Sequence, residues 1–131
     1  MTEQVVVDAS VFVDLLAATD RASAVRASLS GTVLHAPAHF DAEVLSALGR
    51  LQRAGHLTVG LVDASLGRLA RAPVVRHQLT PLVAGAWGRR DVFQLADALY
   101  VELAAQTGYP LLSTDERLVR SWPSARGIGR Q

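Results

Sequence analysis

The sequence contains no cysteine, no lysine and no long apolar run. Without cysteine there can be no disulfide framework, zinc ribbon or thiol nucleophile, and this composition suits a reducing compartment such as the cytoplasm. No apolar stretch approaches the roughly 18 residues of a membrane span. A strand pattern begins by Val5, before a charged and apolar leader could fit. We therefore expect an unprocessed, soluble, cytoplasmic protein without membrane partners.

The lack of lysine and of several motifs excludes further classes of protein. A P-loop needs a lysine, and no Gly-x-Ser-x-Gly turn is present to carry a serine nucleophile. The four histidines do not form a His-Glu-x-x-His pattern, which disfavours a zinc site: they are His35, His39, His56 and His77. Arginine supplies all 13 basic residues. Its guanidinium suits phosphate, so a nucleic-acid partner is plausible, although a GC-rich genome also produces an arginine-only composition.

Strand-like and helix-like segments alternate along the chain. We predict strands at 5–7, 32–35, 73–79 and 109–113, and helices at 11–17, 20–30, 38–54, 58–71, 80–88, 91–107 and 116–121. Expected N-caps include Ser10, Asp20 and Thr80. The tail after Pro123 is a short edge strand or irregular. We expect one domain, residues 1–131, with an α/β fold: a mainly parallel sheet of four or five strands with helices on both faces.

Two aspartates follow strands in the same way. Asp8 ends the first strand and Asp115 closely follows the strand at 109–113, and each precedes a helical pattern. Ligands of open α/β sheets bind outside the carboxyl ends of the strands, so both side chains should lie on one rim. An aspartate at such a junction is also a common helix N-cap or turn residue. Position alone therefore leaves the role of Asp8 open.

Two helices can bring further acids to that rim. Asp97 shares its helical azimuth with apolar residues. A buried unpaired carboxylate costs several kcal/mol, so it is normally protonated, bound to a metal or paired with an arginine. Glu43 and Asp41 lie near opposite borders of the apolar face of the helix at 38–54, and periodicity does not choose between them.

Several carboxylates on one rim favour metal-dependent chemistry. They repel one another, so protons or cations must compensate their charge. Mg2+ prefers oxygen ligands and is typically bound by one or two carboxylates together with a substrate phosphate. Such an ion activates water and stabilises charge on a scissile phosphate. The acids therefore indicate phosphodiester hydrolysis.

Four segments stand in order along the chain and carry these acids: Val-Val-Val-Asp8-Ala-Ser10, Glu43-Val-Leu-Ser-Ala-Leu after Pro37, Leu-Ala-Asp97-Ala-Leu-Tyr-Val, and Leu-Leu-Ser113-Thr-Asp115-Glu-Arg-Leu. Together they resemble the PIN-domain ribonucleases and, more narrowly, the VapC-type toxins of bacterial type II toxin–antitoxin systems. The resemblance covers essentially the whole chain. It implies a PIN-like fold and a metal-dependent endoribonuclease that acts as the toxin of such a pair.

The resemblance also implies roles for particular residues. An acidic quartet would bind Mg2+ or Mn2+, supported by two serine hydroxyls: the acids are Asp8, Glu43, Asp97 and Asp115, and the serines are Ser10 and Ser113. It is the resemblance that selects Glu43 over Asp41. The family often has Asn at the position of Ser46 and Thr at that of Ser113, so the chain departs from it there. Further implications are a homodimer, a cognate antitoxin that occupies the acidic site, and a structured cellular RNA such as tRNA or rRNA as substrate.

Other interpretations stay open beside this one. A catalytically idle PIN-type scaffold would only bind RNA or protein. A phospho-acceptor receiver domain or an aspartate-dependent phosphatase also places an aspartate after the first strand, but both need a partner lysine, and the phosphatase needs a second aspartate where Ser10 stands. We expect Trp87 and Trp122 to pack in the core or an interface rather than stack on bases.

Overall fold

The computed structural model describes residues 2–129. Their five strands form one sheet in the order β3-β2-β1-β4-β5. The strands are β1 (Glu3–Val7), β2 (Thr32–Pro37), β3 (Val74–His77), β4 (Leu111–Ser113) and β5 (Ala125–Gly127). Every neighbouring pair is parallel, so the carboxyl ends of all five strands meet at one edge. This confirms the expected mainly parallel α/β sheet, and the tail after Pro123 supplies its edge strand.

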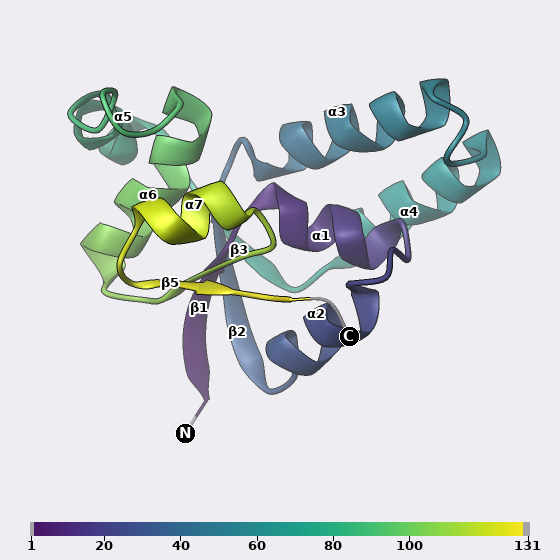
Figure 1. Cartoon of the computed structure of the whole chain (residues 1–131), viewed down its shortest axis with the longest axis horizontal. Helices are drawn as coiled ribbons and strands as arrows, with labels where there is room; N and C mark the ends of the chain where they lie inside the picture. Colours follow the sequence, from purple (N-terminus) through teal and green to yellow (C-terminus); the bar gives the residue numbers. More distant parts are fainter. Residues whose placement is uncertain (1, 130–131) are drawn as a thin grey trace.

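Seven helices flank the sheet in the described part of the chain (Figure 1). They are α1 (Ala9–Leu16), α2 (Ala22–Leu29), α3 (Phe40–Arg53), α4 (Val59–Arg71), α5 (Thr80–Trp87), α6 (Leu95–Thr107) and α7 (Glu116–Ser121). Helices α3 and α4 run together as an arm on one side, and α5 lies toward the opposite side (Figure 1). No helix within residues 2–129 combines the length and apolarity needed to cross a bilayer.

The valine run of the first strand occupies the middle of the sheet. Val5, Val6 and Val7 are all fully buried, because β1 lies between β2 and β4 and has both faces covered. A strand buried on both faces reads as a continuous apolar run rather than as an alternating pattern. The carboxylate that ends this run is thereby carried to the centre of the sheet edge.

Aromatic packing fixes α3 beside α1. The rings of Phe12 on α1 and Phe40 on α3 meet edge to face with their centroids 5.1 Å apart. Val44 and Leu48 continue the buried face of α3. Since Phe40 opens the first turn of α3, this contact also determines where the acids of that turn lie.

Several predicted helix starts are wrong by a few residues. Asp8, not Ser10, is the N-cap of α1, and its carboxylate accepts the backbone N–H of Val11. Arg21 and Leu79 occupy the N-cap positions of α2 and α5 without a side-chain cap. The predicted helix at 91–107 begins only at Leu95, because residues 88–93 form turns.

The two tryptophans differ from each other. Trp122 is half-buried against the core, with the Arg89 guanidinium 4.9 Å from its ring centroid. Trp87 is 57% exposed and carries the Arg90 guanidinium 4.7 Å from its ring centroid. Trp87 therefore does not pack in the core of this chain, and its place in an interface stays a prediction.

Candidate active site

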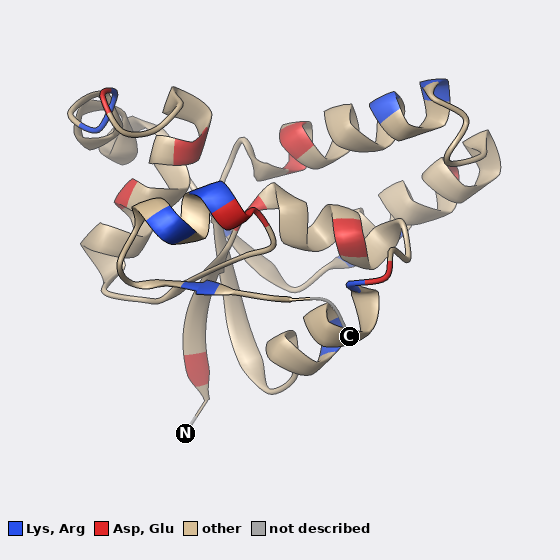
Figure 2. Ribbon diagram, in the orientation of Figure 1, with Lys and Arg blue, Asp and Glu red and all other residues tan. Residues whose placement is uncertain are grey.

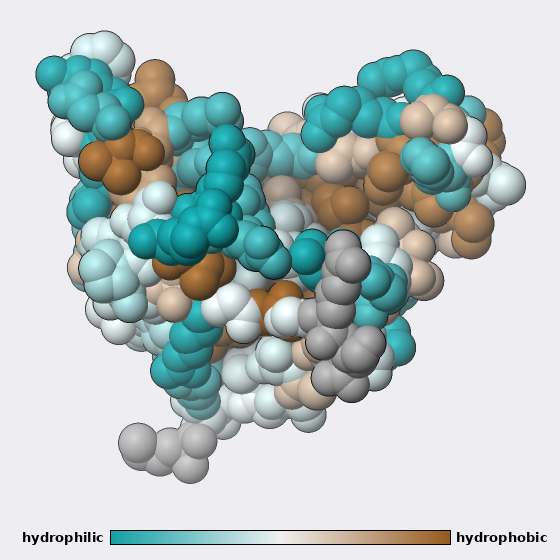
Figure 3. Space-filling view, in the orientation of Figure 1, coloured by the Kyte–Doolittle hydropathy of each residue, from teal (hydrophilic) through white to brown (hydrophobic). Residues whose placement is uncertain are grey.

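The four predicted acids line one cavity of about 420 Å³. Asp8 and Asp115 follow β1 and β4, while Glu43 and Asp97 lie in the first turns of α3 and α6. The surface is hollowed between the α3–α4 arm and α7 (Figure 3). Four separate elements thus bring the acids together at the carboxyl edge of the sheet.

Asp8 forms the buried floor of the cavity and is only 5% exposed. The Ser10 hydroxyl donates to its Oδ1 at 2.5 Å and the Ser113 hydroxyl donates to its Oδ2 at 2.6 Å. Burial raises the pKa of Asp8 from 3.8 to about 6, and the two hydroxyls oppose that rise. The N-cap and the functional interpretation of Asp8 are therefore compatible, because one carboxylate serves α1 and also faces the cavity.

The two serines also join the ends of β1 and β4. Ser113 Oγ accepts the backbone N–H of Asp115 at 2.9 Å, and Ser10 Oγ accepts that of Thr114 at 3.2 Å. Each hydroxyl therefore donates to Asp8 and accepts from the turn that carries Asp115. This network fixes the backbone carrying one acid relative to the side chain of the other.

Glu43 is held by a tyrosine from α6. The Tyr100 hydroxyl donates to Glu43 Oε1 at 2.6 Å, and His39 Nε2 lies 3.5 Å from the same oxygen. Tyr100 is 1% exposed. Burial, followed by the hydrogen bond to Glu43, raises the pKa of Tyr100 far above its ordinary value, so it remains a donor. The sequence alone indicated no role for this hydroxyl.

Asp97 forms no ion pair with any residue within 2–129. Burial raises its pKa first, and the neighbouring charges of Asp115 and Glu43 raise it further. The charges of Arg117 and His39 oppose this rise to a smaller extent. The alternative of a buried Asp97–arginine salt bridge is therefore wrong.

Asp115 is the N-cap of the short helix α7. Its Oδ1 accepts the backbone N–H of Arg117 at 3.0 Å, and its Oδ2 lies 3.8 Å from the guanidinium of the same residue. The Asp115 side chain is 30% exposed, so it is more accessible to water than the buried Asp8.

Asp41 has a structural partner instead. Arg76 Nη2 and Nε donate to its two carboxylate oxygens at 2.9 and 3.1 Å. The same guanidinium donates to three backbone carbonyls, those of Leu69, Ala72 and Val74. Asp41 does not line the acid cavity, whereas Glu43, two residues further on, does.

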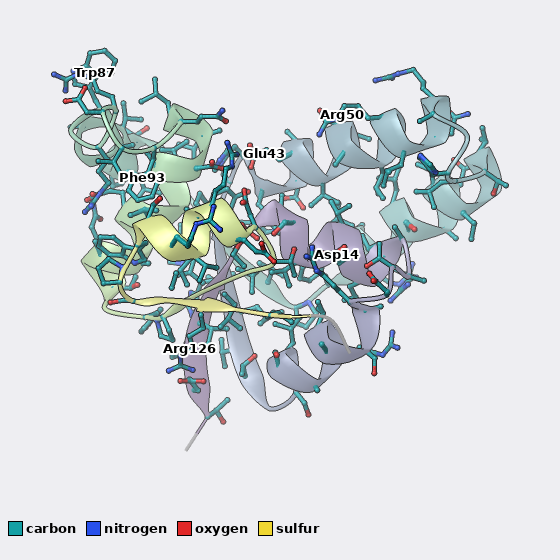
Figure 4. All side chains as sticks on the ribbon, viewed as in Figure 1. Asp14, Glu43, Arg50, Trp87, Phe93 and Arg126 are labelled. Carbon is teal, nitrogen blue, oxygen red and sulfur yellow. The ribbon has the colours of Figure 1, made fainter. Side chains whose placement is uncertain are left out.

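Three further charged residues that sequence analysis did not select line the same cavity: Asp14, Arg21 and Arg50. Asp14 accepts the Thr19 hydroxyl at 2.8 Å. Arg50 lies on α3 with Glu43 (Figure 4). Its spacing of seven residues from Glu43 places both on one helix face, and this signal could have found it. Arg50 adds a positive charge to the cavity from α3, while the Arg21 guanidinium lies 4.0 Å from Glu116 of α7.

The donor set fits a hard divalent cation in its chemistry. All four predicted ligands offer carboxylate oxygens, which Mg2+ and Mn2+ accept. Within residues 2–129 no three or more histidine, aspartate or glutamate side chains stand close enough together to hold a metal ion as a group. Mg2+ commonly takes only one or two carboxylates and completes its shell with water and substrate oxygens, so the arrangement is compatible with such an ion.

The comparisons with known proteins agree with this geometry. The family model for the PIN domain matches residues 5–121. Ribonuclease VapC3 of Mycobacterium tuberculosis is 69% identical over 128 residues, which cover 97% of this chain and 93% of that protein. Ribonuclease VapC12 of the same organism is 37% identical, with 89% and 91% covered.

Two solved structures share the fold at low sequence identity. PAE2754 of Pyrobaculum aerophilum has a TM-score of 0.69 and 22% identity, covering 97% of this chain and 84% of its own. VapC20 of Mycobacterium tuberculosis, described as a Sarcin-Ricin loop cleaving toxin, has a TM-score of 0.69 and 15% identity, covering 97% and 99%. The chain belongs to the PIN-domain family and, within it, to the VapC group.

Proposed function

We propose that this chain, acting as a single domain, is a Mg2+- or Mn2+-dependent endoribonuclease and the toxin of a toxin–antitoxin pair. One observation carries the proposal: four acids from four elements line a single cavity at the carboxyl edge of the sheet. Sequence similarity supports it as well, since the chain is 69% identical to proteins named Ribonuclease VapC3. An idle scaffold would have no need to keep Asp97 half-buried without an ion-pair partner within residues 2–129.

In this proposal four carboxylates would hold the cation: Asp8, Glu43, Asp97 and Asp115. A bound Mg2+ or Mn2+ supplies water activation and charge stabilisation at the scissile phosphate. The pKa values of Asp8 and Asp97 are both raised. A nearby positive charge lowers the pKa of a carboxyl group, so binding of the cation would be coupled to proton release from Asp8 and Asp97.

The other residues orient the acids. Ser10 and Ser113 hold both oxygens of Asp8 by donated hydrogen bonds, and Tyr100 holds one oxygen of Glu43. Each of the two acids keeps lone pairs that these donors do not use. The donors thus restrict side-chain rotation without blocking the carboxylates, and outer partners of this kind commonly tune metal sites.

The partners belong to the same proposal. A cognate antitoxin would inhibit by placing arginine against the carboxylates, because a guanidinium can bind a carboxylate through two hydrogen bonds. A homodimer would cover the exposed apolar side chains of Val83, Trp87 and Leu95, which line a common hollow on α5 and α6. The substrate would be a structured cellular RNA of the tRNA or rRNA class, encountered in the cytoplasm.

Cleavage of RNA by the purified protein tests the proposal. We expect cleavage of tRNA or rRNA with Mg2+ or Mn2+ and none with excess EDTA. Glu43→Gln should reduce the cleavage rate at least about 100-fold. Loss of a residue that only orients a metal ligand costs up to about that factor, and Glu43 is proposed to bind the cation directly. Asp41→Asn, two residues away on α3, should retain activity because its partner Arg76 lies outside the cavity.

Each result has a defined meaning. Cleavage that persists in EDTA but disappears in Glu43→Gln would refute metal dependence. Equal losses in both variants, at matched thermal stability, would refute the assignment of Glu43 over Asp41. RNA binding without cleavage under any metal would favour the idle scaffold.

A further inference from the structure

A second hollow of about 240 Å³ adjoins the acid cavity, and Asp97 lines both. It lies between α7 and residues 92–94, with Arg117 and Arg120 among its lining side chains. We propose that this hollow is a binding subsite for the nucleotide next to the scissile phosphate, and that Arg120 binds the phosphate of that nucleotide. The inference rests on the proposed ribonuclease function and adds a substrate contact to it.

The charge pattern provides the first argument. Successive phosphates of an RNA strand each carry a negative charge. A strand held over the acid cavity therefore brings its flanking phosphates close to Asp97 and Asp115, whose charges repel them. Cations beside the cavity must offset this repulsion. Helix α7 displays both charge signs at the site, with red and blue segments next to each other (Figure 2).

Arg120 is the free cation on this side of the site. Arg117 and Arg120 are three residues apart on α7, so they lie on neighbouring parts of one helix face. Arg117 lies 3.8 Å from Asp115. Arg120 is exposed and forms no hydrogen bond or ion pair with any residue from 2 to 129. Its planar guanidinium is therefore free to bind a phosphate through two parallel hydrogen bonds.

The shape and lining of the hollow provide the second argument. Phe93 and Leu118 are buried residues that give it an apolar floor, while Gln94 is exposed at its edge. Figure 4 shows Phe93 lying close to α7. An apolar floor accepts the face of a nucleobase, and a side-chain amide offers one acceptor and two donors to its edge. The hollow thus combines contacts for a base with a cation for its phosphate.

The acid cavity also has a basic residue on α3. Arg50 lines the cavity from that helix, whereas Arg21, which lines it too, lies 4.0 Å from Glu116 of α7. A single strand crossing the cavity would meet cations before and after the acids. This arrangement places the scissile phosphate over the carboxylates and its neighbours over the guanidinium groups.

Arg120→Ala tests the inference, with Arg126→Ala as a matched control. Arg126 is on β5, away from the hollow, and is paired with Glu3 (Figure 4). Affinity for a fluorescent single-stranded RNA is measured in EDTA at several salt concentrations, so that no cleavage occurs. Losing one phosphate contact should reduce the slope of log affinity against log salt by about 0.7. We expect this change in Arg120→Ala and none in Arg126→Ala.

Kinetics with metal provide a second readout. Arg120→Ala should raise KM several-fold with little change in kcat, and Arg120→Lys should restore part of the loss. The effect should vanish for a cleavable RNA shortened by the nucleotide that occupies the hollow. Equal salt slopes and equal KM values for Arg120→Ala and Arg126→Ala would refute the subsite, even if the protein cleaves RNA. RNA binding without cleavage would refute the proposed activity, while the salt slopes would still decide the subsite.

Discussion

Replacing Asp8 with asparagine should stabilise the protein in the absence of metal at neutral pH. Folding raises the pKa of Asp8 from 3.8 to about 6 because the carboxylate loses its hydration. The folded state therefore binds this proton more tightly than the unfolded chain does. Ionising Asp8 lowers the free energy of unfolding as the pH rises through that interval. The stabilisation carried by the proton is complete below the lower pKa and lost above the higher one.

The structure sets the size of the effect. The interval between the two pKa values corresponds to about 3 kcal/mol. Asparagine replaces one acceptor by a donor, so the hydroxyl of Ser10 or Ser113 must reverse its hydrogen bond, at a cost of about 1 kcal/mol. A net gain of about 2 kcal/mol remains, which is about 7 °C in Tm for a domain of this length.

Thermal and urea unfolding in EDTA between pH 4 and pH 8 measure this difference. We expect Asp8→Asn to be more stable than the unmodified protein above about pH 6. It should lose this advantage near pH 4, where Asp8 is protonated in the folded state and partly protonated in the unfolded chain. Adding Mn2+ should then raise the Tm of the unmodified protein more than that of the variant. Asp41→Asn is the control: it breaks a half-exposed pair with Arg76 and should lower stability by up to about 1 kcal/mol.

A variant that is less stable than the unmodified protein at pH 7.5 would refute this reasoning. Such a result would mean that the hydrogen bonds from Ser10 and Ser113 outweigh the desolvation of Asp8. A stability difference that does not vary with pH would equally exclude a titrating Asp8 as its cause.

The remaining predictions concern the groups that hold the acids and one helix cap. Tyr100→Phe removes the donor to Glu43 and should weaken Mn2+ affinity about 10-fold or more in a metal titration, while near-native stability would exclude global unfolding as the cause. Ser113→Ala removes a donor that lowers the pKa of Asp8, so the acidic limb of the pH–rate profile should move above about pH 6; an unmoved limb would contradict this. Thr58→Ala removes the cap of α4 and should cost about 1 kcal/mol in urea unfolding with unchanged RNA cleavage, since Thr58 lies outside the acid cavity.

The sequence was most informative where local pattern and topology agree. The valine run before Asp8 predicted a buried strand, and parallel strands necessarily end at one edge. Asp115 repeats the same succession after β4, so the proximity of these two acids followed from the order of the elements. Asp97 was found from its helical azimuth, because a carboxylate on an apolar face is unusual enough to be noticed.

Helical periodicity could not supply the partners of the acids. Asp41 and Glu43 occupy the two borders of one apolar face, and their difference arises from residues distant in the chain. Arg76, 35 positions after Asp41, binds that carboxylate from β3, while Tyr100, 57 positions after Glu43, binds the other from α6. A helical wheel gives the direction of a side chain but not the element that packs against it. Packing between elements therefore determines that Glu43, and not Asp41, reaches the cavity.

The same limit explains why the arginines of the site were missed. Arg21, Arg50, Arg117 and Arg120 come from two helices and the start of a third, and no short motif joins them. Their common feature is position around a shared set of carboxylates, which exists only after the sheet edge has assembled. Acids held close together without complete pairing make the cavity costly for the isolated fold, whereas arginines around it make it suitable for a polyanion. The two features together favour a substrate that brings both cations and phosphates to the site, as RNA does.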